Sequence, residues 1–223
     1  MSILYLVSTP IGNLKDITLR AKEVLASVDV IACEDTRKTG LLLQKLEIQS
    51  KPKLFSYYEE NEAVRIPQII QLLKTGKNIA LVSNAGTPTL SDPGFKLVRE
   101  CIAQDIKIES IPGPSAILTA LVVSGLPTDK FLFLGFLPKK QGKRKKIFTS
   151  LPEKTTIIFF ESPYRLLKTL NELKEFLGDI EIIVCRELTK MHQEVRREKI
   201  SQSIAHFAKT KPKGELTLLF RLS

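Results

Sequence analysis

The chain has 223 residues, of which 43% are hydrophobic and 26% charged, as in ordinary soluble globular proteins, and no apolar run approaches the roughly 18 residues of a transmembrane helix. Three widely spaced cysteines and two lone histidines, without a Cys-x-x-Cys pair, indicate neither a disulfide framework nor a zinc site, so we expect no metal. The formal net charge of +10 favours a polyanionic partner such as a nucleic acid, with solubility alone as the alternative explanation.

The N-terminal segment has neither the basic region nor the cleavage site of a secretion signal, so we expect a cytoplasmic protein with no membrane association. Residues 3–7 are an apolar run typical of a buried strand, followed by a loop containing Pro10 and by a helix that we expect to be capped near Asp16 or Thr18. This start contains no G-x-G-x-x-G and no G-x-x-x-x-G-K-[ST] motif. The chain is therefore neither a standard dinucleotide-binding protein nor a P-loop NTPase.

A second strand is expected over residues 28–33, and polar side chains follow it in the segment Glu34–Lys38. Ionisable and hydroxyl groups at the end of a strand are candidates for catalysis or binding. The alternative is that Asp35 or Thr36 caps the helix that runs to Leu46.

Residues 53–56 and 79–82 predict the third and fourth strands, with a helix between them that reaches Lys74. The fourth is a run of four apolar residues, and the loop Ser83–Gly94 that follows it contains two glycines and two prolines. In open α/β sheets ligands bind at the carboxyl ends of the strands, and a small residue such as Gly86 lets a ligand approach the backbone. An ordinary strand-to-helix connection is the alternative.

A second loop of the same kind follows a strand at residues 108–111. It reads Pro112-Gly113-Pro114-Ser115-Ala116 and precedes an apolar helix to Ser124, with Ser115 as the expected N-cap. The unpaired N–H groups at the start of that helix would face a ligand. The alternation of strands and helices up to residue 111 predicts a parallel α/β domain.

The remaining sequence predicts a second domain. Its strands are expected over residues 131–136, 156–160, 181–185, 194–197 and 216–221. The last strand directly follows Pro212-Lys-Gly214, which indicates mixed strand directions. Lys139–Lys146 carries six positive charges in eight residues, and we favour contacts with RNA phosphates over a merely solvated surface.

Six motifs together resemble those of S-adenosylmethionine-dependent methyltransferases of the tetrapyrrole methylase superfamily. They are Thr9-Pro-Ile-Gly-Asn-Leu14, Cys33-Glu-Asp-Thr-Arg37, Ala85-Gly-Thr-Pro88 with Ser91-Asp-Pro-Gly94, Pro112-Gly-Pro-Ser-Ala116, Gly135-Phe-Leu-Pro138 and Arg186-Glu-Leu-Thr-Lys190. Within that superfamily they resemble the branch that methylates the ribose 2′-hydroxyl of a cytidine in the decoding centre of 16S rRNA. The resemblance covers the chain from residue 3 to about residue 221.

The resemblance implies the class III methyltransferase fold, with two α/β domains over residues 1–112 and 113–223, a parallel and then a mixed sheet, S-adenosyl-L-methionine in the cleft between them, and a homodimer. The residues expected to line the cofactor are Pro10, Ala85, Gly86, Thr87, Leu90, Ser91, Ser115, Ala116, Phe160 and Thr217. The implied partner is 16S rRNA in the small ribosomal subunit. The residues expected to bind it are Arg37, Lys139, Lys140, Lys143, Arg144, Lys145, Lys146, Arg186 and Lys190.

Methyl transfer from a sulfonium to a hydroxyl is an in-line displacement, and much of its rate comes from placing the reacting atoms. A ribose 2′-hydroxyl is a weak nucleophile, so a nearby base could help, and the unranked candidates are Glu34, Asp35 and Glu161. The cations Arg37, Arg186 and Lys190 would hold phosphate or offset developing charge.

Two positions depart from the family pattern. Asn84 stands where Asp is common, and Arg197-Glu198 stands where an Arg-Gly pair is expected. Two other functions therefore stay open. One is a tetrapyrrole methylase, against which the basic run and the first loop argue, and the other is a non-catalytic RNA-binding protein on the same fold, which Asn84 favours.

Overall fold

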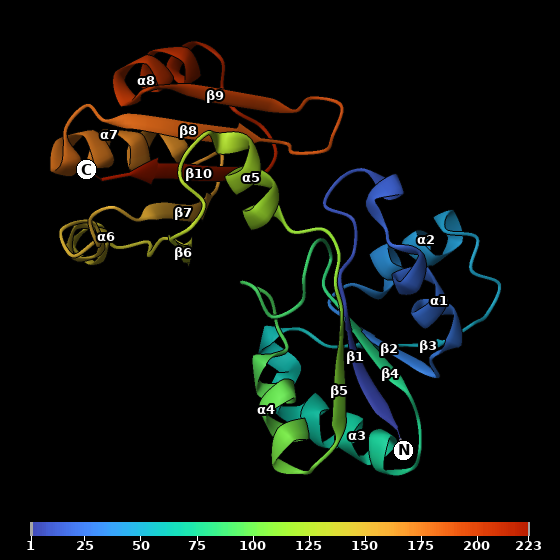
Figure 1. The fold of residues 1–223 in the computed structure, drawn as a ribbon. Helices are drawn as coiled ribbons and strands as arrows, with labels where there is room; N and C mark the ends of the chain where they lie inside the picture. The colour runs from blue at the N-terminus through green and yellow to red at the C-terminus, as the bar shows by residue number, and fades with distance from the viewer. Residues whose placement is uncertain (1, 223) are drawn as a thin grey trace. The chain divides into compact units, whose positions relative to one another are not determined.

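The computed structural model describes residues 2–222 (Figure 1). The chain divides into two compact units, residues 1–115 and 116–223, whereas the motif-based prediction places the division after residue 112. Each unit contains one five-stranded sheet. None of the helices within residues 2–222 combines the length and the apolar character needed to span a bilayer.

The N-terminal unit alternates strands and helices. Its strands are β1 (Ile3–Val7), β2 (Val30–Cys33), β3 (Lys53–Ser56), β4 (Ile79–Val82) and β5 (Lys107–Ile111), and its helices are η1 (Leu14–Asp16), α1 (Leu19–Ser27), α2 (Thr36–Lys45), η2 (Glu59–Asn61), α3 (Glu62–Lys74) and α4 (Phe95–Ala103). The strands are parallel and lie in the order β3-β2-β4-β1-β5, which confirms the predicted parallel domain.

Helices cover both faces of this sheet, which explains why its central strands are continuous apolar runs. Figure 1 shows α1 and α2 on one face and α3 and α4 on the other. Leu25 and Leu43 are buried in the core of the first face, and Leu73 and Leu97 in that of the second. Every residue of β2 and of β4 is buried.

Local sequence signals set the helix starts. The hydroxyl of Thr18 accepts a hydrogen bond from the N–H of Ala21 at 3.0 Å and caps α1, which decides between the two expected caps. The second strand begins at Val30, not Val28, because Val28 still closes the end of α1 by donating its N–H to the Val24 carbonyl at 3.1 Å.

The C-terminal unit begins with a helix and then builds a mixed sheet. Its elements are α5 (Ala116–Ser124), β6 (Phe131–Phe136), α6 (Gln141–Phe148), β7 (Thr156–Glu161), α7 (Leu166–Leu177), β8 (Glu181–Arg186), β9 (Glu194–Lys199), α8 (Ile200–Lys209) and β10 (Leu216–Arg221). The strand order is β6-β7-β10-β8-β9, with β6 parallel to β7 and the other pairs antiparallel, which confirms the predicted mixed sheet.

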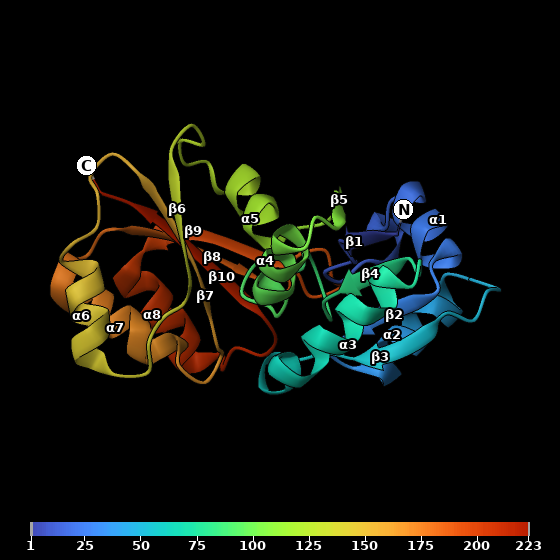
Figure 2. The same ribbon diagram turned by 90° about the horizontal axis from the view of Figure 1, so that it is seen from below.

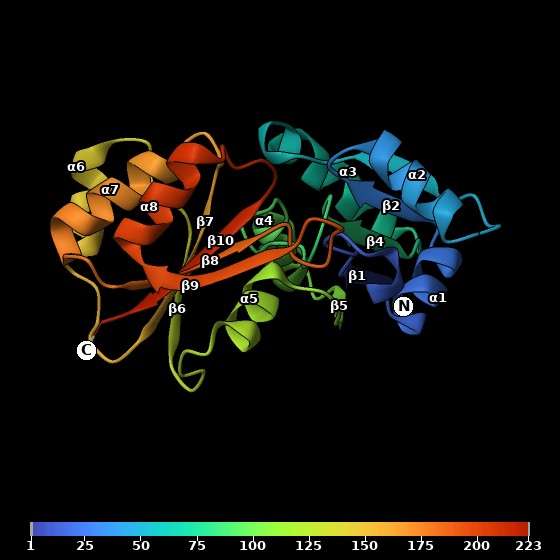
Figure 3. The same cartoon turned by 90° about the horizontal axis from the view of Figure 1, so that it is seen from above.

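The C-terminal unit is also layered. Phe148 of α6, Leu170 of α7 and Phe207 of α8 are buried together with β7, β8 and β10 in one hydrophobic core. Figures 2 and 3 show these three helices on one face of the sheet and α5, which packs against β10, on the other.

Three cysteines are buried as free thiols, namely Cys33, Cys101 and Cys185. Burial raises the pKa of Cys101 to about 11 and that of Cys185 to about 12, and it also raises the pKa of Cys33. At neutral pH all three are protonated.

A buried carboxylate fixes the end of the loop between β4 and α4, here called the β4 loop (Ser83–Gly94). Glu62 accepts hydrogen bonds from the Tyr57 hydroxyl at 2.7 Å and from the Gly94 N–H at 3.0 Å, and it pairs with Lys96 at 2.9 Å. Burial opposes the ionisation of Glu62, but the bonds from Lys96, Tyr57 and Gly94 outweigh it and lower its pKa. The charge of Glu62 therefore helps to hold the loop.

We predict that Glu62→Gln lowers the free energy of unfolding by about 1–3 kcal/mol at pH 7, because an amide cannot replace a carboxylate that accepts from a cation. The folded pKa of Glu62 lies below its ordinary value of 4.5, so its contribution is present above that pH and is lost as the pH falls through the folded pKa. The difference between the wild type and the variant in urea denaturation should therefore shrink below about pH 4.5.

Glu60→Gln is the matched control, because Glu60 lies nearby but is exposed. Its free energy of unfolding should stay within about 0.5 kcal/mol of the wild type. A Glu62→Gln difference that stayed constant down to pH 3 would contradict the prediction.

Candidate functional site

The loops after β1 and β4 leave the carboxyl edge of the parallel sheet at a topological switch point, where neighbouring strands connect to opposite faces. β1 and β4 are neighbours, but their connections run to helices on opposite faces, α1 and α4. In open α/β sheets this is the place where ligands bind. The β4 loop, one of the two Gly/Pro loops from which a binding site was predicted, thus leaves the sheet at its switch point.

Backbone hydrogen bonds join the β4 loop to the loop after β1. The N–H of Thr9 donates to the Gly86 carbonyl at 2.9 Å, and the N–H of Gly86 donates to the Thr9 carbonyl at 3.0 Å. Gly86 has φ +83°, which favours glycine, and a Cβ there would lie 3.4 Å from Cγ2 of Ile11. The two loops therefore form one fixed unit.

The loop after β5 is joined to the same unit by hydroxyl groups. The Ser8 hydroxyl donates to Oγ1 of Thr87 at 3.1 Å, and Thr87 donates in turn to the carbonyl of Pro114 at 3.1 Å. Gly113 allows the close approach, because a Cβ there would lie 3.0 Å from Cβ of Ser8. Three loops are thus held together, and they carry the predicted cofactor residues Pro10, Ala85, Gly86, Thr87 and Ser115.

The second half of the β4 loop has a strained backbone. Thr89 and Ser91 adopt positive φ, at +73° and +65°, which side chains other than glycine rarely do. Such strain often occurs at binding sites. Between them Leu90 is 43% exposed, so an apolar side chain that was predicted to line the cofactor is available for contact.

Three predicted cofactor residues belong to the C-terminal unit. Phe160 and Thr217 lie directly opposite each other on β7 and β10. The ring of Phe160 packs against the rings of Phe133 and Phe136, with centroids 5.0 and 5.4 Å away. Ala116 is the first residue of α5.

Glu34 and Asp35, two of the three candidate bases, lie at the end of β2. Asp35 caps α2 by accepting hydrogen bonds from the N–H groups of Arg37 and Lys38. The pKa of Asp35 is lowered, mainly by the hydrogen bond from the Arg37 side chain and further by these two N–H groups. The capping alternative is therefore confirmed for Asp35. Glu34 instead accepts from the N–H of Asn84 at 2.9 Å and from its amide nitrogen at 3.3 Å, which ties it to the β4 loop.

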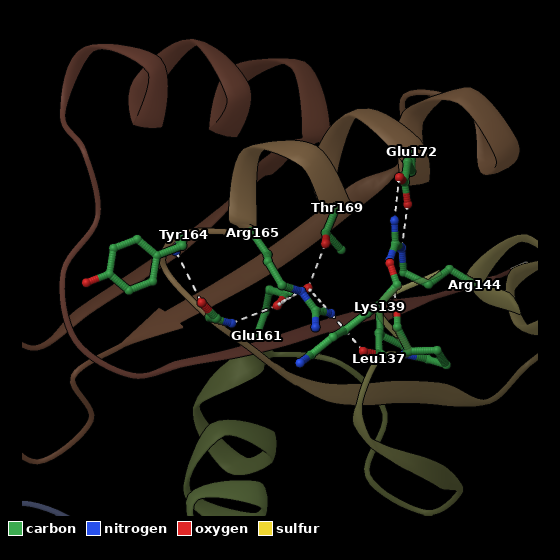
Figure 4. Close-up of polar contacts among 10 residues, drawn as sticks. Leu137, Lys139, Arg144, Glu161, Tyr164, Arg165, Thr169 and Glu172 are labelled. Atoms are coloured by element: carbon green, nitrogen blue, oxygen red, sulfur yellow. Dashed lines mark hydrogen bonds and ion pairs between the residues drawn. The ribbon is translucent and has the colours of Figure 1, made fainter. Parts of the chain in front are cut away.

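Glu161, the third candidate base, has its acceptor positions occupied inside the C-terminal unit. Its side chain is fully buried, and it receives Nε of Arg165 at 3.0 Å, the Thr169 hydroxyl at 2.6 Å and the Ser162 N–H at 2.7 Å (Figure 4). A carboxylate that is enclosed in this way cannot take a proton from the hydroxyl of a bound RNA. The prediction for Glu161 is wrong, because a strand-end carboxylate in sequence does not reveal what surrounds it.

The structure also contradicts the prediction that Arg144 binds RNA. It is 2% exposed, and it donates to both carboxylate oxygens of Glu172 at 2.6 Å and to the carbonyls of Pro138 and Lys139 at 2.6 and 2.7 Å (Figure 4). The hydrogen bonds to Glu172 raise the pKa of Arg144. Arg144 therefore cannot contact phosphate, because α6 turns it inward on the same face as the buried Phe148.

The other residues predicted to bind RNA differ in whether their side chains are exposed or paired with carboxylates. The remaining cations of Lys139–Lys146 are exposed, namely Lys139, Lys140, Lys143, Lys145 and Lys146. The side chain of Arg37 is also exposed, by 90%. Arg186 pairs with Glu194 at 2.8 Å, and Lys190 pairs with Glu187 and Glu215 at 2.7 and 2.9 Å. The last two are therefore weaker candidates for phosphate contacts than the lysines.

The sequence did not single out Glu62, which fixes the β4 loop, or Glu172, which fixes Arg144. The available signal was a charged residue on the apolar face of a helix, which is rarely buried without a partner. Among residues 2–222, no three His, Cys, Asp or Glu side chains cluster as a metal site would require.

Known proteins with related sequences provide a second line of evidence. The model of the Tetrapyrrole (Corrin/Porphyrin) Methylases family matches residues 3–203. Ribosomal RNA small subunit methyltransferase I of Thermotoga maritima is 49% identical over 98% of this chain and 98% of its own. The protein of the same name from Hydrogenobaculum sp. is 48% identical over 97% of this chain and 94% of its own.

Solved structures show a similar fold. Uroporphyrin-III-C-methyltransferase from Thermus thermophilus has a TM-score of 0.68 and 21% identity, covering 98% of this chain and 94% of that one. A complex of the Thermus enzyme with S-adenyl homocysteine has a TM-score of 0.66 and 16% identity, covering 98% and 97%.

We predict that Arg144→Met lowers the free energy of unfolding by about 3–5 kcal/mol, because it leaves Glu172 buried without its cation. The double variant Arg144→Met/Glu172→Leu removes both charges and should recover most of that loss. Urea denaturation of both single variants and the double variant measures the coupling. Losses that simply add would show that the two side chains do not stabilise each other.

Proposed function

Because the chain belongs to the tetrapyrrole methylase family, and within it to the ribosomal RNA small subunit methyltransferase I group, we propose that it methylates the ribose 2′-hydroxyl of a decoding-centre cytidine in 16S rRNA. The observation that carries this assignment is the near-full-length similarity to relatives named for small-subunit rRNA. The exposed lysines of residues 139–146 support an RNA substrate. A ribosomal substrate implies a cytoplasmic protein, and the homodimer implied by the motifs stays a prediction.

S-adenosyl-L-methionine supplies the methyl group, activated on a positively charged sulfur. The edge of the N-terminal sheet suits such a ligand, because Leu90 of the β4 loop offers an exposed apolar side chain. Hydrogen bonds join that loop to the loops after β1 and β5. Little ordering entropy would then be lost on binding.

Among the three candidate bases, Glu34 is the one that neither caps a helix nor lies in a closed network. Asn84 donates to both of its oxygens, which orients the carboxylate. An Asp at position 84 would instead place a second negative charge about 3.3 Å away. We therefore assign Glu34 as the group that would accept the hydroxyl proton, and Asn84 as the residue that positions it.

The proposed function predicts methyl transfer to RNA with a defined product. Small ribosomal subunits that lack the modification, incubated with the protein and methyl-labelled S-adenosyl-L-methionine, should incorporate label at the 2′-oxygen of one decoding-centre cytidine. Alkaline hydrolysis followed by mapping checks this, because a 2′-O-methyl group blocks cleavage of the adjacent phosphodiester. Uroporphyrinogen III is the parallel substrate, and label on it without label on the RNA would overturn the proposal.

Salt dependence tests the exposed lysines of the basic segment. We predict that Lys139→Ala/Lys140→Ala/Lys143→Ala flattens the plot of log K against log salt by about two to three units, since each lost phosphate contact contributes roughly 0.7–0.9. Cofactor affinity should not change. Fluorescence anisotropy with a labelled 16S rRNA fragment at several salt concentrations measures the slope.

A matched variant removes the same charge elsewhere. Lys45, Lys51 and Lys74 are exposed lysines of the N-terminal unit. Replacing all three by Ala changes the net charge equally and should leave the slope within error of the wild type. Equal slopes for the two triple variants would refute a specific role of residues 139–143.

A further inference from the structure

Tyr164 is an aromatic residue that the fold does not use. It lies between β7 and α7 in the turn Ser162–Arg165, and it is 98% exposed (Figure 4). Tyr57, by contrast, is fully buried and donates its hydroxyl to Glu62. A fully exposed aromatic ring is available to stack on a ligand, so Tyr164 is a candidate for binding.

The backbone under Tyr164 is fixed. The Ser162 N–H donates to Glu161 at 2.7 Å, and the Tyr164 N–H donates to the Ser162 hydroxyl at 3.2 Å. Glu161 is itself held by Arg165 and Thr169 (Figure 4). Only the two side-chain torsions of Tyr164 are then left to order, so the ring can bind a flat ligand at small entropic cost.

Two arginines connect this turn to the start of the basic segment. Nη2 of Arg165 donates to the Leu137 carbonyl at 2.8 Å, and Nη1 of Arg144 donates to the carbonyls of Pro138 and Lys139 (Figure 4). Three consecutive carbonyls are therefore held from the core side. The turn and the segment that precedes α6 belong to one framework.

The topology places the same two segments at one edge of the sheet. β6 and β7 are neighbouring parallel strands, so their carboxyl ends meet at that edge. Lys139 and Lys140 follow the end of β6, and Tyr164 follows the end of β7. A flat aromatic ring and exposed ammonium groups at one edge of a sheet match the two parts of a nucleotide, the base and the phosphate.

We propose that Tyr164 stacks on a nucleobase of the RNA while Lys139 and Lys140 contact the adjoining phosphates. The proposal rests on the proposed function, because it requires an RNA ligand. Stacking accepts any base, so the residue would hold an unpaired nucleotide in place without selecting its identity. In this arrangement Glu161 and Arg165 act through Tyr164 as positioning residues.

Two substitutions separate the ring from the hydroxyl. Tyr164→Ala should weaken binding of a single-stranded 16S decoding-centre oligonucleotide roughly 5- to 150-fold, while Tyr164→Phe keeps the ring and should bind like the wild type. The salt slope should stay the same in both, because no charge is removed. Inorganic polyphosphate, which has no bases, should bind all three proteins equally.

A fluorescent variant reports stacking directly. The chain contains no tryptophan, so Tyr164→Trp introduces a single indole at the site. The oligonucleotide should quench its emission by stacking, and polyphosphate should not. Leu19→Trp is the matched control, since Leu19 is 82% exposed on α1 and its indole should respond to neither ligand.

Each of the following results would overturn the proposal. Wild-type RNA affinity in Tyr164→Ala would show that the ring carries no binding energy, and an equal loss in Tyr164→Phe would assign the contact to the hydroxyl. A change in sedimentation of Tyr164→Ala without a change in RNA affinity would assign the ring to a contact between copies of the chain. If the wild type itself binds no RNA, the proposed function fails and the stacking proposal fails with it.

Discussion

Carboxylates taken out of water must be compensated by donors, and this requirement organises both units of the chain. Glu62 is compensated by groups that end the β4 loop, so α3, α4 and the loop are fixed together. Glu161 and Glu172 are compensated by two arginines that also hold the backbone leading into α6. The burial of charge is thus coupled to the placement of exposed loops, and the loops are where ligands are proposed to bind.

Methyl transfer places modest demands on the protein's chemistry and strict demands on its geometry. The cofactor supplies the reactive carbon, so the protein mainly has to align an acceptor oxygen with it. The features of the N-terminal sheet edge suit that task, since hydrogen bonds through Thr9, Gly86 and Thr87 join three loops into one unit. Preorganised backbone is a more economical device for alignment than a set of mobile side chains.

Apolar runs and turn residues were enough to predict most of the fold. The strands at 53–56, 79–82, 131–136 and 216–221 have the predicted bounds, because each contains apolar residues and is flanked by turn or loop residues. Side-chain direction was harder to predict. A basic run contains too few apolar residues to fix its helical phase, so nothing local showed that Arg144 points inward while Lys143 points outward. Glu172, the partner of Arg144, comes from α7 and is 28 positions away in the sequence, beyond the reach of local pattern. The partners of Glu161 are close in sequence, but no pattern shows that Arg165 and Thr169 turn toward it.

The three buried thiols have a practical consequence for following the chain in solution. A protonated cysteine in a closed core reacts with alkylating reagents only when its surroundings open, so labelling rates measure local opening. Cys33 and Cys101 belong to the N-terminal unit and Cys185 to the C-terminal unit. Mass spectrometry of the labelled peptides can therefore time the opening of each unit separately, and a ligand that closes one of them would protect its own thiols first.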